Sequence, residues 1–372
     1  MKKAVVVLLC LVILLLGLPM AGVYLFGTPF DRYLEFPPKS QFVSHAPFSW
    51  TAFLIYLSII ILAILPFATR ALRARPAKGE QWREKNPFPV WGWMAMVFGI
   101  VFWALAWTRF NWFSPFQAHT FAPLWICFII TVNACCYKRT GSSLLTHHTR
   151  FFLFLFPSSG AFWWFFEYLN RFVQNWHYTG VNFGAFQYFV LATISFSTVL
   201  PAVVSVQQFV LSFGWINEGF ERWVRFGQVS NTVVGGGLIM GAVALFFVGI
   251  IPNVLFPMLW VAPLIIMVSV QILTGQEHVF SGLARGDWRI PVSSAMAALI
   301  CGWFWEMWNY WSLAKWHYTV PLVDRFHVFE MPILGYAGYL PFGIECVAIG
   351  GLIKGLCCPL EPASLARPRE QR

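Results

Sequence analysis

The chain contains one stretch twice, first as FFEYLNRFVQNWHY at residues 165–178 and again as FWEMWNYWSLAKWHYTVP at residues 304–321. Each copy carries a Glu, an Asn three residues later, and then Trp-His-Tyr. Residues three apart share one face of a helix. Each copy therefore predicts a helix with an acid and an amide on the same side, and the duplication predicts a fold built from repeats.

Further features recur at nearly the same offset. Leu124-Trp125 returns as Leu259-Trp260, and Leu200-Pro201 returns as Leu340-Pro341. We predict two four-helix units, at about 85–212 and 225–354, between a two-helix segment at 1–84 and a tail at 355–372. Because each unit crosses an even number of times, the two would enter a membrane in the same sense, as parallel repeats about an axis along the membrane normal.

The composition predicts an integral membrane protein. Of 372 residues, 58% are hydrophobic and 11% charged, whereas a soluble domain is about a quarter charged. Apolar runs of about 20 residues, long enough to cross the hydrocarbon layer, recur along the chain. We predict an all-α fold with about ten transmembrane helices, near 1–26, 48–68, 89–108, 119–137, 150–172, 185–212, 231–252, 254–273, 291–311 and 331–353.

Basic residues in the loops predict the orientation. The loop 69–88 holds six Lys and Arg residues and should be cytoplasmic. Counting spans from it places both termini in the cytoplasm, with residues 1–26 as an uncleaved signal anchor. The net charge of +10 then reflects topology and contacts with anionic membrane lipids. No basic surface outside the membrane indicates a nucleic-acid partner.

The eight cysteines form no C-x-x-C pair and lie mostly within apolar runs. They predict neither a metal site nor a disulfide framework. No motif for a cofactor is present, so any chemistry would rest on side chains.

Carboxylates at membrane depth are costly, which makes them candidates for function. The candidate catalytic residues are Glu306, Asn309, Glu330, Glu345, Glu167 and Asn170. The first unit has Val190 and Ser205 where the second has Glu330 and Glu345, so a single site would lie in the second unit. Alternatively, each Glu-Asn pair pins neighbouring helices together.

Aromatic residues surround these acids. They can form interfacial belts, or they can line a pocket for an apolar ligand or a developing cation. The candidate substrate-binding residues are Trp303, Trp305, Trp308, Trp316, His317, Tyr318 and Trp164.

Three functions follow. The first is an enzyme that modifies a hydrophobic small molecule from the membrane, an isoprenoid or triterpenoid lipid, by acid–base chemistry through a carbocation. The second is a proton-coupled transporter of a hydrophobic compound. The third is an assembly protein in which the Glu-Asn pairs join helices. The sequence leaves the oligomeric state open.

The two repeated stretches resemble those of a family of largely uncharacterised polytopic proteins of the bacterial inner membrane, which implies the same location here. In architecture and chemistry alone, the chain is similar to membrane terpenoid-modifying enzymes such as tetrahymanol synthase and the heterodimeric-type lycopene cyclases. No catalytic motif of those enzymes matches residue by residue, so no residue role is carried over.

Overall fold

The computed structural model describes residues 2–29, 31–36, 41–74 and 86–358. The described chain is mainly α-helical, which confirms the predicted all-α fold apart from two short ribbons of strands. The long helices are α1 (Lys2–Leu25), α3 (Trp50–Arg73), α4 (Val90–Trp107), α5 (Phe121–Thr140), α7 (Thr149–Val173), α8 (Ala185–Phe196), α9 (Val199–Leu211), α11 (Asn231–Phe247), α13 (Met258–Leu273), α14 (Arg289–Tyr310) and α15 (Tyr339–Cys357). Short helices are α2 (Asp31–Leu34), α6 (Leu144–His147), α10 (Gly214–Phe220) and α12 (Pro252–Leu255), with 3₁₀ turns η1 (Asn111–His119), η2 (Ser281–Arg285) and η3 (Ile333–Gly338).

Within the described residues, six helical segments are long and apolar enough to cross a membrane, not about ten. They are Trp50–Arg73, Val90–Trp107, Phe121–Thr140, Ala185–Leu211, Arg289–Tyr310 and Ile333–Cys357. Three predicted spans correspond to shorter apolar helices, Leu9–Leu25, Asn231–Phe247 and Met258–Leu273. Helix α7 is long, but Pro157, two serines and Glu167 make it less apolar. The chain is thus an integral membrane protein with fewer clear spans than its apolar runs predict.

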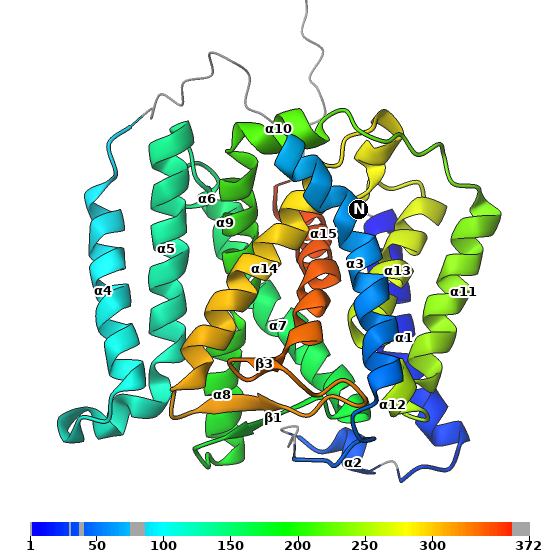
Figure 1. The fold of residues 1–372 in the computed structure, drawn as a ribbon, viewed down its shortest axis with the longest axis horizontal. Helices are drawn as coiled ribbons and strands as arrows, with labels where there is room; N and C mark the ends of the chain where they lie inside the picture. The colour runs from blue at the N-terminus through cyan, green and yellow to red at the C-terminus, as the bar shows by residue number, and fades with distance from the viewer. Residues whose placement is uncertain (1, 30, 37–40, 75–85, 359–372) are drawn as a thin grey trace, which may run out of the picture.

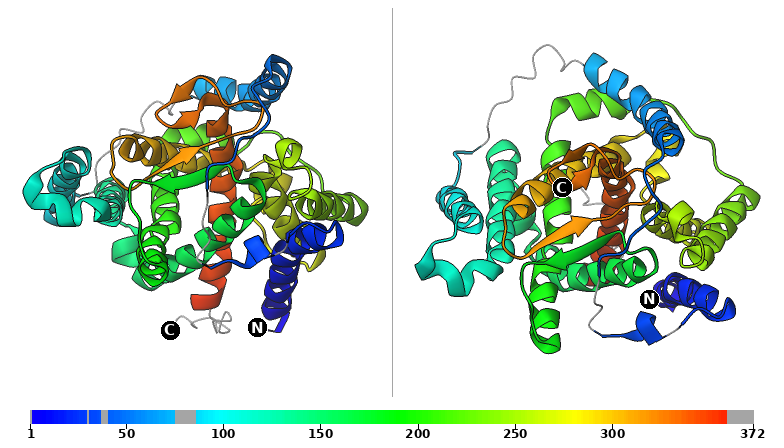
Figure 2. Two further views of the ribbon diagram at one scale, coloured as in Figure 1. Left: turned by 90° about the horizontal axis from the view of Figure 1, so that it is seen from below. Right: turned by 60° about the horizontal axis from the view of Figure 1, so that its bottom comes forward.

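Helices α7, α9, α14 and α15 form the centre of the bundle, where α14 packs against both α9 and α15. On one side α5 packs against α9 and α4 covers α5. On the other side α11 packs against α13 and α1. Figure 1 shows these two groups on opposite sides of the central helices, and Figure 2 shows that α3 runs along the outside of the bundle.

Helix α3 is attached mainly at its two ends. At its start, the Ser49 N–H donates to the Leu322 carbonyl over 2.9 Å. Near its end, Arg70 Nε donates to the Gly219 carbonyl of α10 over 2.7 Å. Between these ties only Phe53 is buried. The middle of α3 is therefore exposed on the side that faces away from the bundle, and it makes few close contacts with the helices on its other side.

Two antiparallel ribbons lie at the end of the bundle opposite α10 (Figure 1). Strand β1 (Trp176–Thr179) pairs with β2 (Lys315–Tyr318), and β3 (His327–Val328) pairs with β4 (Met331–Pro332). The first ribbon joins the two repeated Trp-His-Tyr motifs, with His177 opposite His317. Gly180 follows β1 with φ +91°, and a Cβ there would overlap the Leu313 carbonyl. Only glycine fits that close approach of two loops.

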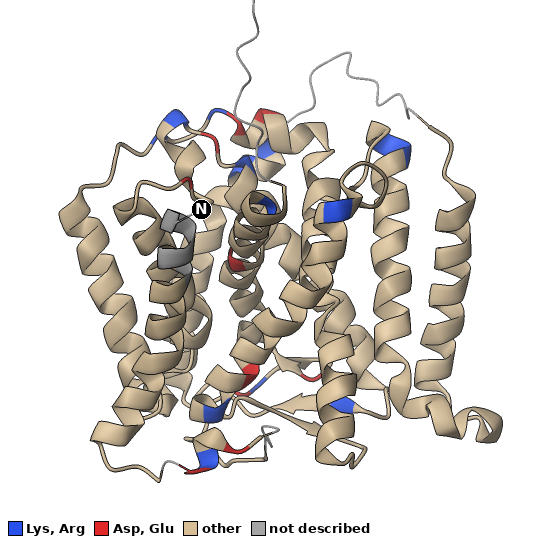
Figure 3. Cartoon of the chain, turned by 180° about the vertical axis from the view of Figure 1, so that it is seen from behind, with Lys and Arg blue, Asp and Glu red and all other residues tan. Residues whose placement is uncertain are grey.

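Charged residues gather at the two ends of the bundle and leave a middle layer with few charges (Figure 3). This distribution suits helices embedded in lipid. Several basic residues of the loop 69–88 and of the tail at 355–372, which the predicted topology places in the cytoplasm, lie outside the described residues: Arg75, Lys78, Arg83, Lys85, Arg367, Arg369 and Arg372.

Candidate functional site

Glu167 of α7 is buried, with 1% of its surface exposed. Its Oε1 atom accepts hydrogen bonds from Trp163 Nε1 at 3.1 Å, Trp176 Nε1 at 3.0 Å and Tyr178 OH at 2.6 Å. Burial and the nearby Glu167 raise the pKa of Tyr178 well above its usual range. The hydroxyl therefore stays protonated and donates a hydrogen bond to Glu167. The carboxyl group therefore ties α7 to strand β1.

The two asparagines hold the strands and do not pair with their glutamates in the described structure. Asn170 Nδ2 donates to the Trp176 carbonyl over 2.8 Å. Asn309 makes the equivalent bond to the Trp316 carbonyl over 2.8 Å and accepts from the Trp316 N–H at 2.9 Å. Because they satisfy backbone groups at the start of each strand, these amides orient the ribbon relative to α7 and α14.

Glu306 of α14 is fully buried and has a different set of donors. Its Oε1 atom accepts from Tyr318 OH at 2.8 Å and from Tyr339 OH at 2.6 Å. Trp316 Nε1 donates to the Tyr318 hydroxyl over 2.9 Å. The Oε2 atom has no hydrogen-bond partner among the described residues. Glu306 is thus held by two hydroxyls, whereas two of the three donors to Glu167 are indoles.

A compensating exchange of side chains produces this difference. In the repeat alignment, Trp163 and Val199 of the first unit correspond to Gly302 and Tyr339 of the second. A Cβ at Gly302 would overlap the Tyr339 ring. In the first unit the indole of Trp163 on α7 donates to Glu167. In the second unit that position is a glycine, and the phenol of Tyr339 on α15 donates to Glu306 instead.

A cavity of about 680 Å³ lies inside the ribbon, between the two repeated motifs. This volume falls within the usual range for small-molecule sites. Its wall is almost entirely apolar and rich in aromatic rings: Tyr56, Phe121, Trp163, Trp176, Tyr178, Phe183, Tyr188, Phe196, Phe256, Trp260, Trp305, Trp316, Tyr318 and Tyr339. Neither Glu167 nor Glu306 lines it. Tyr178, Tyr318 and Tyr339 therefore lie between the cavity and a buried carboxyl group.

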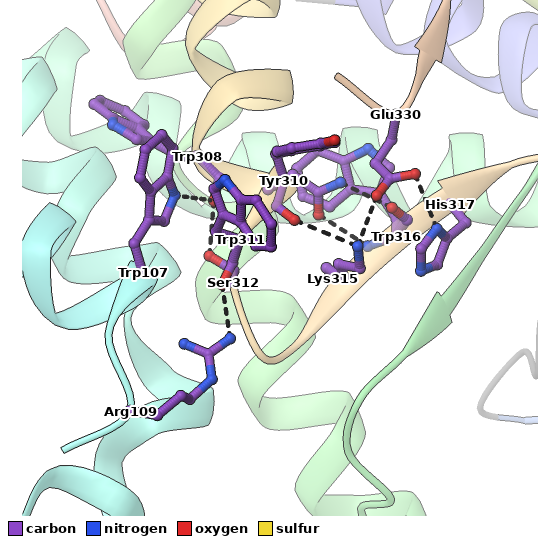
Figure 4. Close-up of polar contacts among 11 residues, drawn as sticks. Trp107, Arg109, Trp308, Tyr310, Trp311, Ser312, Lys315, Trp316, His317 and Glu330 are labelled. Carbon is purple, nitrogen blue, oxygen red and sulfur yellow. Dashed lines mark hydrogen bonds and ion pairs between the residues drawn. The ribbon is translucent and has the colours of Figure 1, made fainter. Parts of the chain in front are cut away.

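The ribbon also carries a charged cluster. Figure 4 shows Lys315 and His317 on either side of Glu330. Lys315 Nζ lies 2.6 Å from Glu330 Oε1, and His317 Nδ1 lies 3.0 Å from Oε2. Burial raises the pKa of Glu330, but the hydrogen bond from Lys315 and the charge of His317 outweigh it, so the net pKa is lowered. The His177 ring stacks on His317 with centroids 5.7 Å apart, and burial and His317 lower its pKa.

The structure brings some predicted site residues together and leaves others apart. Trp305, Trp316 and Tyr318 line the cavity, whereas His317 points to Glu330. The others lie away from the cavity wall. Trp303 is 48% exposed, Trp308 packs on Trp125 and accepts from Trp107 through its carbonyl (Figure 4), and Trp164 donates to Thr193 Oγ1 over 2.9 Å. Glu345 is buried on α15, with no partner for Oε2 in the described chain.

Most residues of the cavity wall are not among those predicted from the sequence, and the missed residues include the tyrosines Tyr178, Tyr339 and Tyr56. Tyr178 belongs to the repeated Trp-His-Tyr motif, so the repeat itself was a signal. Tyr339 directly precedes the repeated Leu-Pro, where the first unit has Val199. Tyr56 lies on α3, outside the repeats, and no pattern in the sequence places it at the cavity.

Comparison of the chain with protein-family models, with curated proteins and with solved structures finds no match.

Proposed function

We propose that this protein is a membrane-embedded enzyme that modifies an apolar lipid of the isoprenoid or triterpenoid class in the aromatic cavity. One observation carries the proposal: Tyr318 and Tyr339 both line the cavity and both hydrogen-bond Glu306. A proton can pass between a ligand and Glu306 through either hydroxyl, although the carboxyl group itself does not reach the cavity. Such positioned proton transfer is general acid–base catalysis.

The cavity wall suits the charged intermediate of this chemistry. Protonation of an alkene leaves a carbocation, and the faces of Trp and Tyr rings attract cations. Trp305, Trp316 and Trp260 all contribute to the wall. Loss of a proton to the tyrosine–glutamate pair would end the reaction as an isomerisation or a cyclisation. The resident side chains can supply both proton steps.

The second unit is the better candidate for the chemistry. Its glutamate contacts two tyrosines of the cavity wall and keeps one oxygen without a partner in the described chain. Glu167 contacts one such tyrosine, Tyr178, and its other two donors are indole N–H groups that do not pass protons on. In this proposal Tyr318 and Tyr339 contact the ligand, Glu306 exchanges protons with them, and Glu167 positions the ribbon. Asn170 and Asn309 serve as positioning residues for the strands.

We further propose that the two units are parallel repeats and that the ribbon lies on the outer side of the membrane. The pairing of His177 with His317 is the contact expected of two equivalent motifs about a two-fold axis. That axis along the membrane normal is the relation predicted for two parallel four-helix units. Arg70 and Arg289 lie near α10, at the end opposite the ribbons, which supports cytoplasmic loops there and a ribbon on the outer side of a bacterial inner membrane.

Glu345 favours a second candidate function, proton-coupled transport of a hydrophobic compound. It is a buried acid one helical turn beyond Phe342, a ring that packs on the cavity residues Trp163 and Trp260. A transporter uses such a group to carry protons across the membrane.

Total-lipid mass spectrometry on cells with the gene, without it, and with Glu306→Gln tests the enzyme proposal. We expect one lipid to disappear without the gene, a precursor to accumulate, and the variant to fail to restore the product. An unchanged lipid inventory would reject the enzyme, and a proton-dependent flux of a hydrophobic compound that is lost in Glu345→Gln would support the transporter.

A further inference from the structure

The ribbon β1–β2 separates an uncharged inner surface from a charged outer one. Alternate residues of a strand point to opposite faces. Trp176, Tyr178, Trp316 and Tyr318 line the cavity. His177 and His317 alternate with them and stack on each other on the other face.

Lys315 is the only residue with a charged side chain that lines the cavity in the described chain, and its charge is already neutralised. The ammonium donates to Glu330 Oε1 over 2.6 Å and to the Tyr310 carbonyl over 3.3 Å. Figure 4 shows the Lys315 ammonium between the Glu330 carboxylate and the Tyr310 carbonyl. Glu330 does not line the cavity. Because the Lys315 ammonium is paired with Glu330, the described residues give the cavity no unpaired cation.

An anionic head group would therefore find no unpaired opposite charge among the described residues of the wall. A phosphate monoester carries about −1.5 to −2 charges near neutral pH. Burying a charge in an apolar site is costly unless an opposite charge pairs with it. The hydroxyls of Tyr178 and Tyr318 are already engaged as donors to the buried glutamates. A neutral hydroxyl or a plain hydrocarbon meets none of these penalties.

We infer that the cavity selects an uncharged lipid, either a hydrocarbon or a long-chain alcohol, over the phosphorylated form of the same chain. This inference rests on the proposed function and narrows its substrate class. The ion pair between Lys315 and Glu330 is then a specificity element, because it neutralises the lysine charge at the cavity wall. The reaction that supplies the substrate must therefore already have removed any phosphate or diphosphate group.

Photolabelling of the full-length protein in lipid nanodiscs tests the inference. The probe is a C20 isoprenoid alcohol with a diazirine, and unlabelled geranylgeraniol or geranylgeranyl monophosphate competes with it. We expect labelled peptides from the cavity wall, and half-maximal competition by the alcohol at a concentration at least ten-fold lower than by the phosphate. Equal or stronger competition by the phosphate would overturn the selectivity and leave an apolar-lipid site standing. Absence of labelling at the cavity wall would overturn the proposed function as well.

Two variants test the role of the ion pair. Glu330→Gln leaves the Lys315 ammonium without its partner, so competition by the phosphate should improve several-fold. The double variant Lys315→Met with Glu330→Gln removes the freed charge and should restore the preference of the unaltered protein. If the phosphate gains equally in the single and double variants, lost structure rather than charge explains the change, and the role of the ion pair is rejected.

Discussion

Tyr339 occupies space that exists only because residue 302 is a glycine. A Cβ at Gly302 would overlap the Tyr339 ring, and the Tyr339 hydroxyl donates to Glu306 over 2.6 Å. The two residues lie on adjacent helices, α14 and α15, which pack closely along their length. The absence of a side chain on one helix therefore positions the hydroxyl that links the cavity to the buried acid.

Gly302→Ala should destabilise the protein by about 1–3 kcal/mol, the usual cost of overpacking a core. The gain in helix propensity on replacing a glycine, about 1 kcal/mol, offsets only part of this. The measurement is thermal unfolding in detergent. Gly351→Ala is the matched control on α15, because a Cβ at that position would have no described neighbour within 4 Å, and it should not lower the unfolding midpoint. A stable Gly302→Ala protein with full activity would contradict this packing relationship.

Tyr339→Phe should lower turnover by roughly 10- to 100-fold, which is at or below the lower limit of the usual contribution from proton transfer, because Tyr318 remains as a second route. Product formation in membranes, measured by mass spectrometry, gives the rate. Tyr336→Phe is the control. It removes a hydroxyl that donates to the Val328 carbonyl and does not contact Glu306. Equal loss in both variants would point to general damage near η3.

Glu306→Gln should reduce activity by about 10²-fold or more, in the range of a lost general acid–base group. Glu167→Gln should reduce it less, because the amide can still accept from Trp163 and Trp176 and hold the ribbon. The comparison uses product formation normalised to folded protein. An equal loss from both substitutions would reject a single site in the second unit.

His177 should make the protein less stable as the pH falls from neutral to mildly acidic values. Burial and His317 lower its pKa, so below the ordinary histidine value of about 6.5 the unfolded chain binds more protons than the folded one. Stability therefore rises with pH across the interval between the lowered and the ordinary pKa. Glu330, whose pKa is also lowered, would reduce stability only at more acidic pH.

Unfolding midpoints at several pH values, for the unaltered chain and for His177→Gln, check this prediction. The variant should lose the pH dependence in that interval. The same slope in the variant would assign the effect to groups other than His177.

Ile60→Trp should weaken binding of an apolar ligand at least several-fold, because Ile60 of α3 lines the cavity and the larger ring would fill part of it. Leu65→Trp is the control on the same helix, since Leu65 is 52% exposed and outside the cavity wall. Photolabelling with the diazirine alcohol measures both. Equal labelling of the two variants would show that α3 does not bound the ligand space.

The sequence alone determined that this is a helical membrane protein, because the rarity of charge and the length of the apolar runs depend on composition. It also identified the repeated Glu, Asn and Trp-His-Tyr, since a duplication is visible in the order of residues. It overestimated the number of spans because a run of apolar residues does not reveal where a helix breaks. Residues 254–273, for example, divide between α12 and α13.

Only the tertiary structure decided what the repeated residues contact. Glu167 and Asn170 share a helix face, yet the acid bonds aromatic donors from the strand and the amide bonds its backbone. The Tyr339 ring packs against Gly302, which lies on another helix. Residues of α3 line the cavity together with residues that are far away along the chain. Periodicity reports which face of its own helix a residue occupies, whereas the identity of its partner depends on how separate helices pack.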